Sequence, residues 1–83
     1  ARERAEAIRR RVQGDLLHKA NVVGVGVGLR RIQGRQTGEV ALVVMVDHKV
    51  PRAQLAPQDV IPSQIDGIAV DVQEVGELGA LPL

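Results

Sequence analysis

Few residues in this sequence belong to the types that perform chemistry in enzymes. Ser63 is the single serine, His18 and His48 are the two histidines, and there is no cysteine. A serine nucleophile needs a histidine base and an acid within hydrogen-bond reach. His48 follows Asp47, but Ser63 lies in a separate polar stretch. We interpret these as solvated turn residues and expect no catalytic residue in this chain.

The sequence gives equally little support for a metal or a cofactor. Two histidines without a thiolate would need further carboxylates converging on them to hold zinc. Gly24, Gly26 and Gly28 invite comparison with a dinucleotide-binding loop, but that loop has the spacing G-x-G-x-x-G and opens a helix. Here the glycines alternate within a strand pattern. We therefore expect no metal-binding and no cofactor-binding residues.

The same glycines predict a strand with one bare face. Residues 22–29 alternate valine or leucine with glycine, and a period of two places the two kinds of residue on opposite faces. Glycine weakens a strand, so three in register imply that something lies close against them. We expect Gly24, Gly26 and Gly28 to contact another element or a second copy of the chain. The alternative is that the first helix of the same chain covers them.

A helix is predicted from Glu3 to about Lys19. Its apolar residues are spaced by three, four and four positions, which draws one stripe along a helix; they are Ala5, Ile8, Val12 and Leu16. Arg9 and Arg10 lie off this stripe. A run of charges is usually a solvated face, but it can also contact an acidic partner. Arg9 and Arg10 are therefore candidate interaction residues.

The remaining pattern predicts two further strands. Residues 39–50 predict a central strand, because its positions 40–46 are apolar on both alternating faces and look buried on both sides, while Asp47, His48 and Lys49 mark its exposed end. Residues 30–38 read as a hairpin connection, residues 51–55 as a short helix, and residues 68–73 as a third strand with one wet face. The expected fold class is α+β: an N-terminal helix, a three-stranded mainly antiparallel sheet, and a short helix between strands 2 and 3.

Composition and charge limit the possible functions. The 83 residues are 45% hydrophobic and 25% charged, which suits one small folded domain; we place it at residues 1–76, with 77–83 as a C-terminal linker or tail. Residues 1–52 carry a net charge of +6 and the rest −5, so the two halves, or neighbouring copies, can attract each other. The absence of aromatic residues disfavours a nucleic-acid partner. No apolar run approaches the length of a membrane span, so we expect no membrane partner and favour a soluble, cytoplasmic protein.

Several short motifs resemble those of a known family. They are Asn21-Val22-Val23-Gly24-Val25-Gly26-Val27-Gly28, Thr37-Gly38-Glu39, Lys49-Val50-Pro51, Leu55, Asp59-Val60-Ile61-Pro62, Ile65-Asp66-Gly67, and Asp71-Val72 with Glu74-Val75-Gly76. Over about residues 16–77 the set resembles the N-terminal region of bacterial trypsin-like peptidase family proteins, which are similar to the plant narrow-leaf type of peptidase-like proteins. The resemblance implies a non-catalytic accessory domain ahead of a hydrolase. None of the family's catalytic residues has a matching position here.

Three functions follow from these observations. The first is a non-catalytic assembly or interaction domain whose partner is a second copy (a homo-oligomer) or a peptidase domain of the same protein. The second is a fragment of a serine or cysteine hydrolase whose catalytic domain lies outside this chain. The third is a nucleic-acid-binding module that uses the basic first helix. The chain begins with Ala1 rather than Met, so we expect it to be trimmed or a piece of a longer protein.

Overall fold

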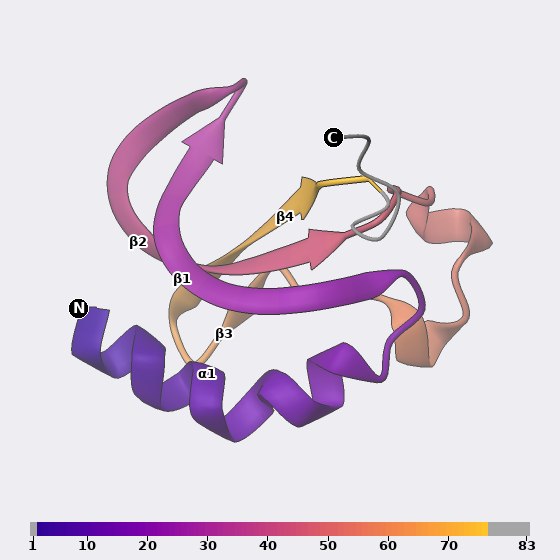
Figure 1. Cartoon of the computed structure of the whole chain (residues 1–83), viewed down its shortest axis with the longest axis horizontal. Helices are drawn as coiled ribbons and strands as arrows, with labels where there is room; N and C mark the ends of the chain where they lie inside the picture. The colour runs from indigo at the N-terminus through magenta and orange to yellow at the C-terminus, as the bar shows by residue number, and fades with distance from the viewer. Residues whose placement is uncertain (1, 77–83) are drawn as a thin grey trace, which may run out of the picture.

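The computed structural model describes residues 2–76 as one helix beside a curved sheet (Figure 1). The elements are α1 (Arg2–Leu17), β1 (Val22–Ile32), β2 (Arg35–Val46), the 3-10 helices η1 (Arg52–Gln54) and η2 (Pro57–Asp59), β3 (Gln64–Ile65) and β4 (Ile68–Glu74). The strands form one four-stranded sheet in the order β1-β2-β4-β3. This confirms the α+β class and the N-terminal helix. The expected linker at 77–83 lies outside the described residues.

The expected number of three strands is wrong. The sheet has four strands and is mixed, because β2 runs parallel to β4 while β1 and β3 run antiparallel to their neighbours. The missed strand β3 has two residues, too few to show a period. The expected helix at 51–55 is also wrong: η1 and η2, of three residues each, stand in its place. Pro51 and Pro57 bracket this stretch, and proline removes the N–H donor that a continuing helix needs.

The central position of the second long strand is confirmed, but its bounds differ from those expected. β2 lies between β1 and β4 and covers Arg35–Val46 rather than residues 39–50. The earlier start of β2 follows from the turn before it, which has only two residues. Gln33 and Gly34 have φ values of 51° and 78°, as a tight hairpin turn of the primed type requires. Both strands therefore extend into residues 30–38, the polar stretch whose pattern predicts a connection.

The hydrophobic core lies between α1 and one face of the sheet. The predicted helix stripe is confirmed, since Ala5, Ile8 and Leu16 are buried on the side of α1 that meets the sheet. Leu42 and Val44 of β2 lie opposite them and are fully buried. Val22, Val25 and Val27 of β1 pack against the same core. The glycines of β1 alternate with these side chains and so occupy the other face.

The hairpin of β1 and β2 curls away from α1 over the glycine face (Figure 1). The curl brings the backbone N–H of Arg31 within 3.0 Å of Asp71 Oδ2 on β4, across 40 residues of sequence. Register shifts next to Gly24 and before Arg31 add to the bend of β1. A strand bends most easily toward a face that carries little side-chain bulk, and glycines supply such a face.

Candidate interaction surfaces

The glycine face of β1 forms the floor of a hollow of about 290 Å³, which we call the glycine hollow. Its walls come from all three long strands and the hairpin tip; the lining residues are Gly26, Val27, Gly28, Leu29, Arg31, Gln36, Val43, Met45 and Gln73. Val43 and Met45 are half-buried although no helix of the described residues packs on this face. The hollow therefore presents backbone and aliphatic side chains together.

Side chains of β2 lie close against two of the three glycines. A Cβ atom at Gly24 would lie 2.9 Å from Met45 Cε, and one at Gly28 would lie 3.2 Å from Val43 Cγ2. A Cβ atom at Gly26 would meet only Met45 Cε, at 4.0 Å. The alternative that α1 covers the glycines is wrong, because α1 packs on the opposite face. Close contact thus explains two glycines and leaves room at Gly26.

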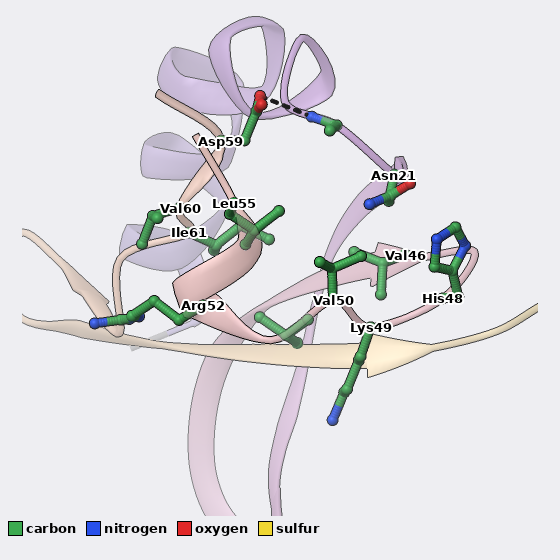
Figure 2. A pocket seen from close by; sticks show the side chains of 12 residues that line it. Asn21, Val46, His48, Lys49, Val50, Arg52, Leu55, Asp59, Val60 and Ile61 are labelled. Atoms are coloured by element: carbon green, nitrogen blue, oxygen red, sulfur yellow. Dashed lines mark hydrogen bonds between the residues drawn. The ribbon is translucent and has the colours of Figure 1, made fainter. Parts of the chain in front are cut away.

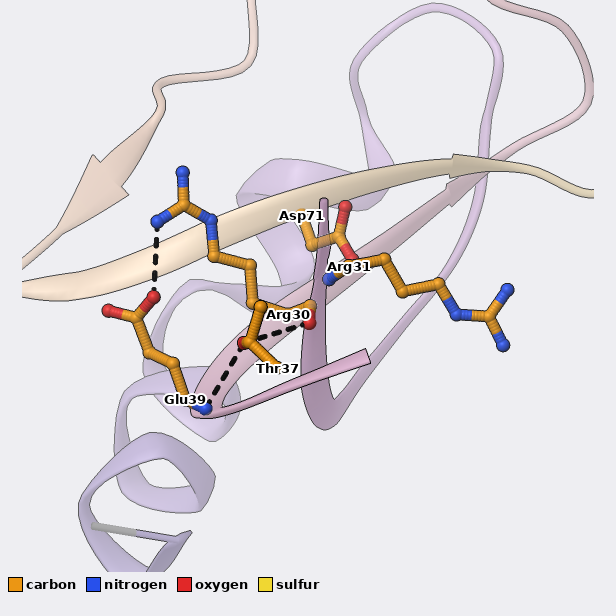
Figure 3. Close-up of polar contacts among 5 residues, drawn as sticks. All are labelled: Arg30, Arg31, Thr37, Glu39 and Asp71. Carbon is orange, nitrogen blue, oxygen red and sulfur yellow. Dashed lines mark hydrogen bonds and ion pairs between the residues drawn. The ribbon is translucent and has the colours of Figure 1, made fainter. Parts of the chain in front are cut away.

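Polar contacts link the two strands near the hairpin tip and tie the tip to β4 (Figure 3). Arg30 Nη1 lies 3.1 Å from Glu39 Oε1, and the Thr37 hydroxyl donates to the Arg30 carbonyl at 3.0 Å. The backbone N–H of Glu39 donates to Thr37 Oγ1 at 3.2 Å. Asp71 accepts the Arg31 backbone N–H, while the Arg31 guanidinium extends away from that carboxylate (Figure 3). The tip is therefore fastened to β4 and keeps a cation at the rim of the hollow.

The candidate arginines of α1 are not brought together with the glycines. Arg9 Nε donates to Glu6 Oε1 at 2.7 Å and its Nη1 donates to Gln13 Oε1 at 2.6 Å, both within the helix. The hydrogen bond and the charge of Arg9 hold the pKa of Glu6 below its usual value. Arg10 is exposed and makes no ion pair among residues 2–76. Arg9 and Arg10 belong to the element that covers the far side of the sheet.

Two further arginines of α1 bind the turn between β3 and β4. Arg4 Nη2 donates to the Asp66 carbonyl at 2.5 Å, and Arg11 forms an ion pair with the Asp66 carboxylate. Asp66 and Gly67 have positive φ values of 49° and 83°, as expected for the predicted Asp-Gly turn. These contacts fasten the β3–β4 turn to α1, and they engage the guanidinium groups of two of the arginines of the helix.

The sequence-predicted chemical residues do not form a catalytic group in this structure. His48 Nδ1 lies 2.9 Å from Asp47 Oδ1 just beyond the end of β2. The Ser63 carbonyl accepts the N–H of Val70 at 3.0 Å, and Val70 pairs with Leu42, far back along β2. Leu42 and the end of β2 at Val46 are four residues apart, at roughly 3.3 Å per strand residue, so His48 and Ser63 lie well apart along the strand direction.

The histidines also lie apart from any group suited to a metal. His18 Nδ1 lies 2.6 Å from the Gly14 carbonyl at the end of α1, so its ring completes the last helical turn. In residues 2–76 there is no cluster of three His, Asp or Glu side chains that could hold a metal ion. In the same residues, no helix is both long and apolar enough to cross a membrane.

A second hollow, which we call the apolar pocket, was not predicted from the sequence. It has a volume of about 230 Å³ and is lined by Ala20, Asn21, Val46, His48, Lys49, Val50, Arg52, Leu55, Asp59, Val60, Ile61 and Val72. These residues come from the turn after α1, the end of β2, the following loop, and β4 (Figure 2). No local pattern reveals such a site. The one indication in the sequence is that the loop between β2 and β3 contains aliphatic residues, whose side chains are usually buried against other groups.

No family model matches this chain, and no curated protein matches it. The family resemblance of the short motifs therefore remains a prediction. The geometry of the two hollows is the basis for a proposed function.

Proposed function

We propose that this chain is a non-catalytic interaction domain, namely the N-terminal accessory domain of a bacterial trypsin-like peptidase protein. Its partner is a second copy of the chain or the peptidase domain of the same protein. The observation that carries the proposal is the asymmetry of the sheet. α1 covers one face, whereas the other presents the glycine hollow with Val43 and Met45 half-buried above a glycine floor.

The size of the domain supports a partner on this face. A chain of 83 residues without aromatic side chains buries a little over about 60% of its unfolded surface when it folds alone. Further burial is most readily obtained between copies or between domains. Backbone at Gly26, where no side chain lies close, lets another element approach. The half-buried side chains of Val43 and Met45 beside it would then lose their contact with water.

The contacts of α1 weaken the nucleic-acid alternative. Arg4 and Arg11 bind the β3–β4 turn and Arg9 binds Glu6, so three of the cations are held by groups of the chain itself. Binding to phosphates would have to compete with these contacts. The hydrolase-fragment alternative makes the same statement about this chain and differs only in placing a catalytic domain elsewhere in the protein. A complete reading frame with a downstream serine or cysteine nucleophile would favour it.

Light scattering at micromolar concentration tests self-association, with Gly26→Val as the informative variant. Gly26 has space for a Cβ atom within its own chain, but a valine there would separate two surfaces that meet over the hollow. Gly38→Val is the matched control, because Gly38 lies in the same hairpin with no atom within 4 Å of its ideal Cβ. We expect an oligomer that Gly26→Val dissociates and Gly38→Val preserves.

A particle of 8.9 kDa, the mass of one chain, would exclude self-association. Retention of the purified peptidase domain by this chain, weakened by Gly26→Val, would then support the interdomain form of the proposal. If neither partner binds, the interaction function is wrong.

Hydrolysis of ester substrates tests whether the chain is non-catalytic. We expect no turnover above the uncatalysed rate. Turnover that disappears in Ser63→Ala would show catalysis and overturn this part of the proposal. Salt-dependent binding of DNA or RNA that Arg10→Gln weakens would instead favour the nucleic-acid function, since such binding falls steeply as salt rises.

A further inference from the structure

The apolar pocket lies where the only parallel pair of strands in residues 2–76 ends. Val46 is the last residue of β2, and Val72 lies near the end of β4. Sheets with parallel strands commonly bind ligands outside the carboxyl ends of those strands, because the connecting loops part there. Figure 2 shows the loop around η1, with Arg52 and Leu55, lining the pocket together with Val60 and Ile61.

The interior of the pocket suits one aliphatic side chain. Six of its lining residues are aliphatic, and they are buried or half-buried: Val46, Val50, Leu55, Val60, Ile61 and Val72. The volume is about 230 Å³, whereas a dry cavity of roughly 150 Å³ accepts a benzene molecule. A leucine, isoleucine or valine side chain therefore fits, but a long lipid chain or a drug-sized ring system does not.

The rim of the pocket carries two cations without an ion-pair partner in the described part of the chain and two carboxylates that each accept a backbone N–H. Lys49 and Arg52 are exposed, and neither makes an ion pair among residues 2–76. Asp59 Oδ1 accepts the Ala20 backbone N–H at 3.0 Å, and Glu74 Oε1 accepts the Lys49 backbone N–H at 2.9 Å. The two carboxylates thus fasten backbone around the pocket. The two cations are left for a ligand.

We propose that the apolar pocket binds a linear peptide segment in which one branched aliphatic side chain is flanked by acidic side chains. The aliphatic group enters the pocket, and the acidic groups meet Lys49 and Arg52, which extend from its rim (Figure 2). Complementary charge selects this partner, because an apolar segment without acids would leave both cations unmatched. The site is separate from the glycine hollow, so either proposal can fail while the other stands.

Titration of the ¹⁵N-labelled chain with a blocked pentapeptide, glycine-glutamate-leucine-glutamate-glycine, tests the site. We expect saturable changes in the amide resonances of residues 46–61 and of Val72. Replacing the leucine of the peptide by alanine should weaken binding about tenfold, because most of the buried side chain is lost. Replacing both glutamates by glutamine should weaken it by about five- to tenfold.

Variants of the chain test the two halves of the site separately. Lys49→Gln with Arg52→Gln should weaken binding of the glutamate peptide about five- to tenfold and leave the glutamine peptide unaffected, as a direct charge contact requires. Arg10→Gln with Arg35→Gln removes the same charge at exposed positions outside the pocket and should change binding less than twofold. Ala20→Leu places a side chain at the pocket and should abolish binding, while its backbone N–H remains available to Asp59.

Three results would overturn the proposal. The first is the absence of resonance changes at millimolar peptide with a chain whose spectrum shows it to be folded. The second is equal loss of affinity in the two double variants, which would mean attraction by net charge alone. The third is binding of free 4-methylpentanoate at the pocket without binding of the peptide, which would assign the site to a small carboxylic acid.

Discussion

Val43 and Val44 are neighbours on β2 and have the same side chain, but they lie on opposite faces of the sheet. Val44 is fully buried among residues of α1 and the sheet, whereas Val43 is half-buried beside the glycine hollow. The difference arises because α1 covers one face and the curled hairpin only partly shelters the other. One face of this sheet therefore holds the core against α1, and the other is only partly covered.

The largest contrast is expected from removing the same two methyl groups on each face. Val44→Ala should lower the free energy of unfolding by on the order of 1–3 kcal/mol, because buried methyls are lost and a cavity is left. Val43→Ala should lower it by less than about 1 kcal/mol, because its site is open to water. Urea unfolding of both variants measures the difference. Equal losses would mean that the glycine face is covered in solution.

Gly28 and Gly26 lie on the same face of β1 but differ in how much space surrounds them, so substitutions there should have opposite effects on stability. Gly28→Val should destabilise the chain by about 1–2 kcal/mol, because its Cβ would lie 3.2 Å from the stiff side chain of Val43. Gly26→Ala should stabilise the monomer by about 0.4–1 kcal/mol, because a Cβ fits there and the unfolded chain loses freedom. Thermal unfolding checks both. A stabilising Gly28→Val would show that the hairpin is less curled than described.

Asp71 tests the link between the hairpin tip and β4. Asp71→Ala removes the acceptor for the Arg31 backbone N–H and should lower the free energy of unfolding by about 1 kcal/mol. Amide hydrogen exchange at Arg31 should accelerate in the same variant. Asp71→Asn keeps a side-chain oxygen and should have a smaller effect. Unchanged exchange at Arg31 in Asp71→Ala would show that the tip is held by other contacts.

The smallest effect is expected at Glu6, on the exposed side of α1. Because Arg9 lowers the pKa of Glu6 in the folded chain, the ionised carboxylate stabilises the fold above the pKa of the unfolded chain. This stabilisation should be lost as the pH falls through the lowered folded pKa, below about pH 4.3. Glu6→Gln should remove that part of the acid sensitivity. Identical acid unfolding curves for Glu6→Gln and the parent chain would contradict the prediction.

Most of the local structure could be predicted from the sequence, because local spacing determines it. The stripe of Ala5, Ile8 and Leu16 predicted the helix and its buried side. The alternation over residues 22–29 predicted β1 and the separation of its two faces. The Asp-Gly turn and β4 also lie where their residue types indicated.

The parts that could not be predicted depend on contacts between distant residues. The residues of β2 and of β4, each taken alone, do not predict that the two strands pair in parallel with Ala41 opposite Ala69. The positive φ of Gln33 is adopted because the hairpin needs it, and glutamine carries no signal for it. The apolar pocket draws on segments around residues 20, 46–61 and 72, so no single window of sequence contains it.

The parallel pairing of β2 with β4 also sets an order for folding. β1 and β2 are joined by a two-residue turn, so their pairing closes a short loop and is expected within about 1–10 μs. β4 reaches β2 only after the chain from Asp47 to Gly67 has crossed over, and long-range contacts of this kind form late. The hairpin and α1 should therefore assemble first. The apolar pocket, which needs Val72 in place, would then be the last part of the molecule to form.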